Sequence, residues 1–394
     1  MSDLNLDFRN TEVAYADKSD KDLQMAELLF RTIASPTVVK LGKWGTKAAG
    51  ALNLPLGWAL RPTIYRHFVG GESLQDSKQT LEKLTKRGVQ AVMDYSAEGG
   101  DDEATIERTF QANMEAVRFA HNNPGLSHAV FKVSGLCKVS TMERANDPNA
   151  QLTNAEREQI NRLRERFMAL CQQAYDQGTR ILVDAEHYAY QGLIDRLTEE
   201  AMIKFNKERA IVFATLQMYR HDRMDYLQGL DEFCQEHGLK CGIKFVRGAY
   251  MEEERARAQQ MGYRDPICAN KEETDNNYDA GVRYVVERIE RMELFCGTHN
   301  ERSCILLAEQ MQEKGLVNDD PRIYFSQLYG MGDFISYNLS NAGYNLTKYL
   351  PYAPVDKVLP YLIRRAEENT SVAGQTGREL ELIRSEVKRR KNKR

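Results

Sequence analysis

Eight short apolar runs, separated by long amphipathic stretches, limit what this chain can fold into more than any other feature of its sequence. Several runs are almost continuously apolar, which is typical of parallel strands buried on both faces. Parallel neighbours must be joined by crossover segments, usually helices. The runs are VQAVMDY (89–95), AVFKVSG (129–135), RILVDAE (180–186), AIVFATLQM (210–218), CGIKFVRGAY (241–250), MELFCGTHN (292–300), RIYFSQLYG (322–330) and LTKYLPYAP (346–354).

The stretches between the runs have the period of amphipathic helices. Apolar residues recur at spacings of three and four over 160–174, and Gly178 is expected to end that helix. Similar repeats occur over 278–289 and 304–311. Eight strand–helix units in order predict an α/β fold, a (β/α)8 barrel, with a doubly wound open sheet as the alternative.

The segments on either side of these units differ from them in composition. Residues 1–88 are predicted to form an N-terminal helical arm, 89–376 the catalytic barrel, and 377–394 a basic C-terminal tail. Between Arg384 and Arg394 the tail holds seven Lys or Arg residues. The simplest interpretation is the solvated end of a helix, and peripheral contact with an anionic membrane is the alternative. Nucleic-acid binding is not expected, because no aromatic residues interleave with these charges.

The remaining composition is that of an ordinary globular protein. No apolar run is long enough for a transmembrane helix, and the N-terminus MSDLNLDFRNTEVAYADKSDKD has no apolar signal core. The seven cysteines are odd in number and form no C-x-x-C pair, which favours free thiols in a reducing compartment. We therefore expect a cytoplasmic protein, with the inner face of the membrane as its only membrane contact.

Polar and charged residues gather at the carboxyl ends of the runs. In a (β/α)8 barrel the chemistry takes place at these strand ends. Buried charges are costly unless they are paired, so such a ring is either an ion-pair network or an active site. The convergence of eight strands on one opening favours an active site. The residues are Asp94, Lys132, Ser134, Asp184, Glu186, Gln217, Lys244, Arg247, Tyr250, Thr298, His299, Asn300, Gln327 and Tyr352.

Several kinds of chemistry find no support in this pattern. No metal site is predicted, because only His187 and His299 lie near strand ends. The sequence contains no G-x-S-x-G elbow, no P-loop and no G-x-G-x-x-G after a strand. Lys132 or Lys244 could form a Schiff base, as in barrel aldolases, and this alternative stays open.

The last predicted helix of the barrel carries two adjacent arginines. Spacings of three, four and seven put Tyr361, Arg365 and Glu368 on one face, with Arg364 beside them. A solvated face with Glu–Arg pairs is the simple interpretation. However, adjacent guanidinium groups repel each other unless an anion neutralises them, and arginine grips a carboxylate with two hydrogen bonds. The pair therefore favours a small carboxylate substrate.

Seven strings follow one another in order along the chain, and the resemblance that they carry covers about residue 68 to residue 373. They are FVGGE (68–72), FKVSGL (131–136), VDAE (183–186), KFVRGAY (244–250), THN (298–300), YFSQLYGMGDFIS (324–336) and YLPYAPVDKVLPYLIRRAEEN (349–369). On these strings the chain resembles the proline dehydrogenases, and it is closer to their monofunctional, eukaryote-like branch than to the domain of the large bifunctional bacterial enzymes. The resemblance implies a distorted (β/α)8 barrel that oxidises L-proline to 1-pyrroline-5-carboxylate, the first step of proline catabolism.

The resemblance also implies a cofactor and site residues. FAD would accept a hydride from proline and pass the electrons to a quinone; no general base can be assigned. The residues implied to bind and orient proline are Lys132, Asp184, Tyr250, Tyr352, Tyr361, Arg364 and Arg365. The residues implied to bind FAD are Gln217, Lys244, Arg247, Gly248, Ala249, Thr298, His299, Asn300 and Glu368.

Two departures from relatives refine these expectations. In the bifunctional branch Lys244 is an arginine and Arg247 a lysine, so the hydrogen bonds at the flavin are expected to differ in detail. Hydroxyproline dehydrogenases resemble the family closely but carry a small residue at the position of Tyr352. The tyrosine therefore favours proline over hydroxyproline, which is kept as the alternative substrate.

Overall fold

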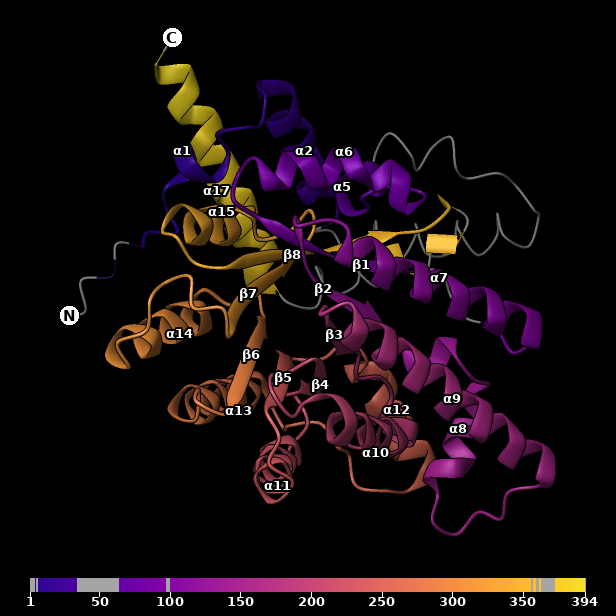
Figure 1. Cartoon of the computed structure of the whole chain (residues 1–394). Helices are drawn as coiled ribbons and strands as arrows, with labels where there is room; N and C mark the ends of the chain where they lie inside the picture. Colours follow the sequence, from indigo (N-terminus) through magenta and orange to yellow (C-terminus); the bar gives the residue numbers. More distant parts are fainter. Residues whose placement is uncertain are drawn as a thin grey trace.

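Eight parallel strands close into a barrel in chain order, β1 to β8, as Figure 1 shows. The computed structural model describes residues 4, 6–33, 64–96, 100–355, 357–358, 361–362 and 373–393. Each predicted apolar run overlaps one strand and the sheet is closed, so the barrel is confirmed and the open sheet is wrong. The strands are β1 (Gln90–Tyr95), β2 (Leu126–Phe131), β3 (Arg180–Val183), β4 (Val212–Gln217), β5 (Cys241–Val246), β6 (Met292–Gly297), β7 (Ile323–Leu328) and β8 (Leu346–Tyr352).

The barrel closes between β1 and β8. Their register runs from Gln90 opposite Thr347 to Tyr95 opposite Tyr352. The β1–β2 pair shifts register between Ala91 and Val92, which is a local irregularity of the barrel. Because the two closing strands end together, the polar end of β1 lies beside the aromatic end of β8.

Helices form the outer layer of the barrel and fall in the stretches that have a helical period. The predicted end at Gly178 is confirmed: the glycine has a φ of 66°, a left-handed conformation that favours glycine after a helix. The helices are α6 (Leu74–Thr85), α7 (Glu103–His121), α8 (Val139–Asn146), α9 (Asn154–Asp176), α10 (Tyr188–Phe205), α11 (Arg223–Glu236), α12 (Met251–Met261), α13 (Lys271–Glu287), α14 (Glu301–Glu313) and α15 (Asp333–Asn341), with a 3-10 turn at Val133–Gly135.

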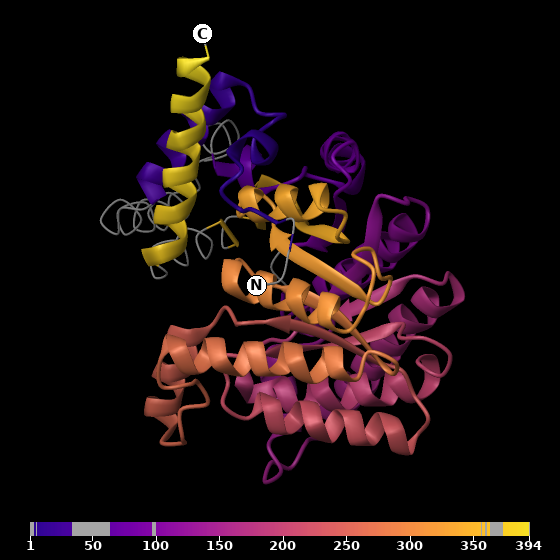
Figure 2. The same ribbon diagram turned by 90° about the vertical axis from the view of Figure 1, so that its left-hand side faces the viewer.

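The two ends of the chain pack together on one side of the barrel. The short helices α1 (Thr11–Ala14) and α5 (Arg66–Phe68) accompany α2 (Asp20–Ile33), and α17 (Ala373–Asn392) ends the chain. Figure 2 shows α17, in yellow, beside the indigo N-terminal helices. None of the helices in the described ranges is long and apolar enough to cross a membrane.

In the interior of the barrel, an apolar layer is followed by a charged layer at the carboxyl ends of the strands. Residues two apart on a strand point to the same side. The buried layer of Val92, Val130 and Leu182 is therefore followed, two residues later on the same strands, by Asp94, Lys132 and Asp184. An apolar layer thus fills the middle of the barrel, above an ion pair between Arg180 and Glu293 at the amino ends of the strands. The charged residues of the predicted site lie at the carboxyl ends.

Candidate active site

A buried carboxylate joins two lysines at the carboxyl end of the barrel. Lys132 Nζ lies 2.6 Å from Asp94 Oδ1 and 3.2 Å from Asp184 Oδ2. Lys244 Nζ lies 2.6 Å from Asp184 Oδ1. The side chain of Lys244 is 5% exposed, and that of Lys132 is 32% exposed. Lys132 is therefore the more open of the two cations.

The electrostatics of this cluster favour the charged forms of Asp184 and Lys132. Burial alone would raise the pKa of Asp184, but Lys244, Lys132 and the hydroxyl of Tyr349 hold it below its ordinary value. Burial would likewise lower the pKa of Lys132, but Asp94 and Asp184 raise it above its ordinary value. At neutral pH the cluster therefore holds an ionised Asp184 and a protonated Lys132, a form suited to binding an anion.

Tyr349 belongs to this cluster, although the analysis of strand ends did not select it. Its hydroxyl donates a hydrogen bond to Asp184 Oδ2 over 2.6 Å. Tyr349 lies opposite Val92 of β1 and shares the inward-facing layer of that residue, a position that becomes visible only once β1 is paired with β8. A search of strand ends alone missed it.

Aromatic side chains enclose the same opening. The ring of Tyr352 lies 5.5 Å from that of Tyr95, and the Tyr352 hydroxyl is buried without a hydrogen-bond partner among the described residues. Tyr361 is buried as well. Tyr250 contacts the ring of His187, with centroids 4.2 Å apart. The structure thus places the predicted tyrosines that it describes near the strand ends.

His187 is in turn fixed by an acid. Its Nδ1 lies 3.2 Å from Oε1 of Glu254, a residue of α12 that is 1% exposed. Burial would lower the pKa of His187, but Glu254, Glu253 and Glu186 raise it above its ordinary value. The contact between His187 and Glu254 therefore links the loop after β3 to α12, next to Tyr250.

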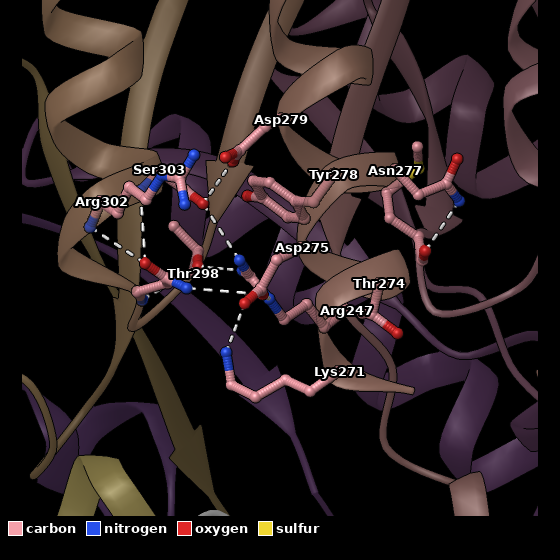
Figure 3. Close-up of polar contacts among 12 residues, drawn as sticks. Arg247, Lys271, Thr274, Asp275, Asn277, Tyr278, Asp279, Thr298, Arg302 and Ser303 are labelled. Carbon is pink, nitrogen blue, oxygen red and sulfur yellow. Dashed lines mark hydrogen bonds and ion pairs between the residues drawn. The ribbon is translucent and has the colours of Figure 1, made fainter. Parts of the chain in front are cut away.

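Arg247 organises a second polar group where β5, β6, α13 and α14 meet (Figure 3). Its Nε donates to Asp275 Oδ1 over 2.8 Å, its Nη1 to Thr298 Oγ1 over 2.5 Å and its Nη2 to Ser303 Oγ over 3.0 Å. The guanidinium also lies 4.4 Å from the ring centroid of Tyr278. Asp275 and Ser303 escaped the sequence analysis because they come from helices rather than strand ends.

Asn300 caps the helix that follows this group. Its side-chain oxygen accepts hydrogen bonds from the backbone N–H groups of Arg302 and Ser303 at the start of α14. A helix N-terminus favours anions, because its first N–H groups and its dipole point outward. Thr298, Asn300, Arg247 and the start of α14 thus form a donor-rich corner that suits a negatively charged group.

The remaining predicted cofactor residues border this corner. Gln217 is buried at the end of β4, opposite Val246 in β5. His299 Nε2 accepts a hydrogen bond of 3.1 Å from Leu328 N, so its Nδ1 carries the proton. Gly248 has a φ of 136°, and a Cβ there would lie 2.4 Å from the Tyr219 ring. Ala249 follows it directly, before α12.

Arg364, Arg365 and Glu368 lie outside the described residues. The carboxylate clamp that they are predicted to form therefore stays a prediction.

The sequence model of the proline dehydrogenase family matches residues 77–378. The chain belongs to this family. The match includes the whole barrel and the start of α17, so the predicted family and its enzymatic class, a dehydrogenase, are confirmed.

Proteins of known name that are similar to this chain carry three different names. The carbapenem antibiotics biosynthesis protein CarD of Pectobacterium carotovorum subsp. carotovorum is 35% identical over 82% of this chain and 83% of its own length. Proline dehydrogenase 1, mitochondrial, of Dictyostelium discoideum is 30% identical over 86% of this chain and 67% of its own length. Hydroxyproline dehydrogenase of Xenopus laevis is 30% identical over 95% and 88%.

The barrel also resembles a solved structure of the bifunctional branch. Proline utilization A from Bdellovibrio bacteriovorus, inactivated by N-propargylglycine, superposes with a TM-score of 0.70 at 21% identity over 93% of this chain. This chain covers 36% of that protein, so it spans about a third of its length. The likeness supports the distorted (β/α)8 fold.

The predicted cytoplasmic location is wrong by these comparisons. The proline dehydrogenases of Dictyostelium discoideum, Homo sapiens, Arabidopsis thaliana and Caenorhabditis elegans are named mitochondrial, which points to mitochondria rather than the cytoplasm. The expectation rested on the N-terminal composition and on the free cysteines. Free thiols are compatible with either compartment, so they do not distinguish between the two.

Proposed function

We propose that this protein oxidises L-proline to 1-pyrroline-5-carboxylate with bound FAD and passes the electrons to a quinone. The observation that carries the proposal is the pair of lysines bridged by the buried Asp184 in a barrel of the proline dehydrogenase family. A carboxylate substrate needs fixed cations, and a redox cofactor that becomes anionic on reduction needs them too.

The residues on the flavin side fit FAD by their chemistry. Arg247, Thr298, Asn300 and the N-terminus of α14 would offer a cation, a hydroxyl, an amide and the positive end of a helix dipole to a pyrophosphate. Lys244 would face the reactive part of the ring system. FAD supplies the hydride acceptor that no side chain provides. The residues proposed to hold it are Gln217, Lys244, Arg247, Gly248, Ala249, Thr298, His299, Asn300 and Glu368.

On the substrate side, the protein binds and orients. Lys132, held protonated by Asp94 and Asp184, would pair with the proline carboxylate together with Arg364 and Arg365. Tyr250, Tyr352 and Tyr361 would cover the ring and exclude water. Such clamping makes the hydride transfer an oriented, nearly unimolecular step.

Oxidation of hydroxyproline and Schiff-base aldolase chemistry are the two alternatives to proline oxidation. Hydroxyproline is the alternative substrate because a hydroxyproline dehydrogenase is among the relatives, and the bulk of Tyr352 argues against it. A Schiff-base aldolase needs a lysine that gives up its proton readily. The raised pKa of Lys132 disfavours that chemistry, and borohydride trapping of a carbonyl substrate on Lys132 or Lys244 would support it.

The flavin spectrum tests the proposal. The purified protein should be yellow, proline should bleach it without oxygen, and a soluble quinone should restore the colour. Hydroxyproline, added in parallel, should bleach it more slowly. A colourless protein that cannot be reconstituted with FAD would refute the proposal. A yellow protein that neither substrate bleaches would refute the substrate assignment alone.

A further inference from the structure

We infer that Tyr349 is a positioning residue that acts through Asp184 to set the charge which Lys132 and Lys244 present at the site. The inference rests on the proposed function, in which the two lysines face the substrate and the flavin. No strand-end pattern pointed to Tyr349, and its place in the cluster follows from the contacts of its hydroxyl and its ring.

The carboxylate of Asp184 receives three donors. Its Oδ1 lies 2.6 Å from Lys244 Nζ, and its Oδ2 lies 3.2 Å from Lys132 Nζ. The hydroxyl of Tyr349 donates to the same Oδ2 over 2.6 Å. Asp184 is therefore shared by both lysines and by the neutral hydroxyl of Tyr349. That hydroxyl sets how strongly the carboxylate attracts each lysine.

The ring of Tyr349 contacts the same ions from another direction. Lys244 Nζ lies 4.7 Å and Lys132 Nζ 5.8 Å from the ring centroid. Cations at such distances are attracted to an aromatic face. One side chain thus meets the carboxylate with its hydroxyl and the two ammonium groups with its ring.

Packing holds Tyr349 in this position. The residue is 9% exposed and lies in the interior layer with Val92, Val130 and Leu182. Its strand is paired on both sides, to Val92 in β1 and to Leu328 in β7. A phenylalanine would fill this apolar layer equally well. Packing therefore explains the ring, and only the charged cluster explains the hydroxyl.

The hydroxyl changes what the lysines can do. A hydrogen bond to an ionised carboxylate spreads its negative charge and weakens its pull on neighbouring cations. Without that bond, Asp184 draws Lys132 and Lys244 more strongly to itself. Less positive charge then remains for a substrate carboxylate on one side and for an anionic reduced flavin on the other.

The variant Tyr349→Phe tests the inference in the flavin-loaded protein. Loss of one bond to a charged group should raise the KM for proline about tenfold. The Kd of cyclopentanecarboxylate, which has the carboxylate but no amine to oxidise, should rise by about the same factor. The reduction potential of the bound flavin should fall, because its reduced form loses cationic stabilisation.

Tyr284→Phe is the matched control. The Tyr284 hydroxyl donates to Asp231 Oδ2 over 2.9 Å, and Asp231 also pairs with Arg288 and Arg291. This group has the same chemistry but lies on α13 and α11, outside the barrel. The control should lose a similar amount of thermal stability and should keep the wild-type KM, Kd and potential.

Unchanged KM, Kd and potential in Tyr349→Phe would overturn the inference and leave the proposed function intact. A wild-type protein without flavin or proline turnover would overturn both. If Tyr349→Phe does not fold, 3-fluorotyrosine at this position provides the second test. Its more acidic hydroxyl donates more strongly, so the potential should rise and the Kd should fall. An unchanged potential there would also contradict the inference.

Discussion

We expect Tyr352 to be the residue that decides between proline and hydroxyproline as substrates. It is 4% exposed at the end of β8, and its hydroxyl has no hydrogen-bond partner among the described residues. Tyr352→Ser should remove the ring that fills this space and shift the ratio of kcat/KM values towards hydroxyproline at least about tenfold. Tyr352→Phe keeps the ring and should leave the ratio nearly unchanged. If both variants discriminate as the wild type does, Tyr352 does not select the substrate.

Gly248 lies beside the predicted cofactor site, at a position where the backbone leaves no room for a side chain. Its φ of 136° is a conformation that side chains rarely adopt, and an added Cβ would lie 2.4 Å from the Tyr219 ring. Gly248→Ala must shift the backbone beside Arg247, so we expect FAD affinity to fall at least about tenfold. Gly262→Ala is the control, since Gly262 also has positive φ but open space around it. Flavin titration of both proteins measures the difference, and equal affinities would contradict it.

How far the sequence predicts the strands depends on the environment of particular residues. The β2 run was predicted to start at residue 129, but the strand begins at Leu126. His128 hid the start, because a polar residue interrupts an apolar run. In the structure its ring lies 5.3 Å from that of Phe213 and 4.9 Å from that of Phe295, inside the barrel. The β5 run was predicted to reach residue 250, but the strand ends at Val246, since Arg247 pairs with Asp275.

Site residues could be predicted from the sequence where a charged side chain lies at or near the end of a strand. Lys132, Asp184 and Lys244 are such residues, and the structure brings them together. Asp275 and Tyr349 were missed because their roles depend on partners distant in the sequence. Local pattern cannot report such pairings, which depend on the closed barrel and on the helices around it.

Helix α17 contacts the barrel through a buried acid. Glu379 Oε2 accepts a hydrogen bond of 2.7 Å from Gly332 N. Burial and nearby Asp333 raise the pKa of Glu379 from 4.5 to about 7, against the opposing effects of Gly332 and Lys348. Asp333 in turn pairs with Lys18 and lies near His67, whose pKa burial lowers to about 4.

The raised pKa of Glu379 predicts the direction of a pH effect on stability. Because the folded-state pKa exceeds the unfolded one, the folded state holds this proton more tightly. Its contribution to stability is full below pH 4.5 and is lost as the pH rises to about 7. The loss is about 3 kcal/mol. Glu379→Gln, which cannot ionise, should therefore raise the Tm more at pH 8 than at pH 5.

The control for this effect is Glu381→Gln on the same helix, where the glutamate is exposed and pairs with Arg378. It should change the Tm little at either pH. A gain in Glu379→Gln that is equal at pH 5 and pH 8 would show that Glu379 does not titrate in this range.

At the scale of the whole molecule, α17 binds the N-terminal arm through ion pairs and hydrogen bonds. The tail was predicted to be the solvated end of a helix, and its helical form is confirmed. Its basic residues are largely paired, however. Arg390 donates to Lys18 O and Tyr15 O over 2.8 Å each and pairs with Asp20. The same arginine contacts Glu386, a carboxylate that is 0% exposed. The ends of the chain therefore stabilise each other across the outside of the barrel.

Arg390→Met tests this mutual support, because methionine keeps the length of the stem and the helix propensity but removes the donors. The arm should lose about 1–3 kcal/mol of local stability, since the variant removes the donor to two backbone oxygens of the arm and leaves buried Glu386 with Arg389 as its remaining ion-pair partner. Hydrogen exchange over Asp20–Ile33 should accelerate accordingly, while the strands of the barrel keep their protection. Lys391→Met, at an exposed neighbouring position, is the control and should change neither. If exchange in the arm stays at the wild-type rate, the apolar contacts of Leu23 and Phe30 hold the arm without the arginine.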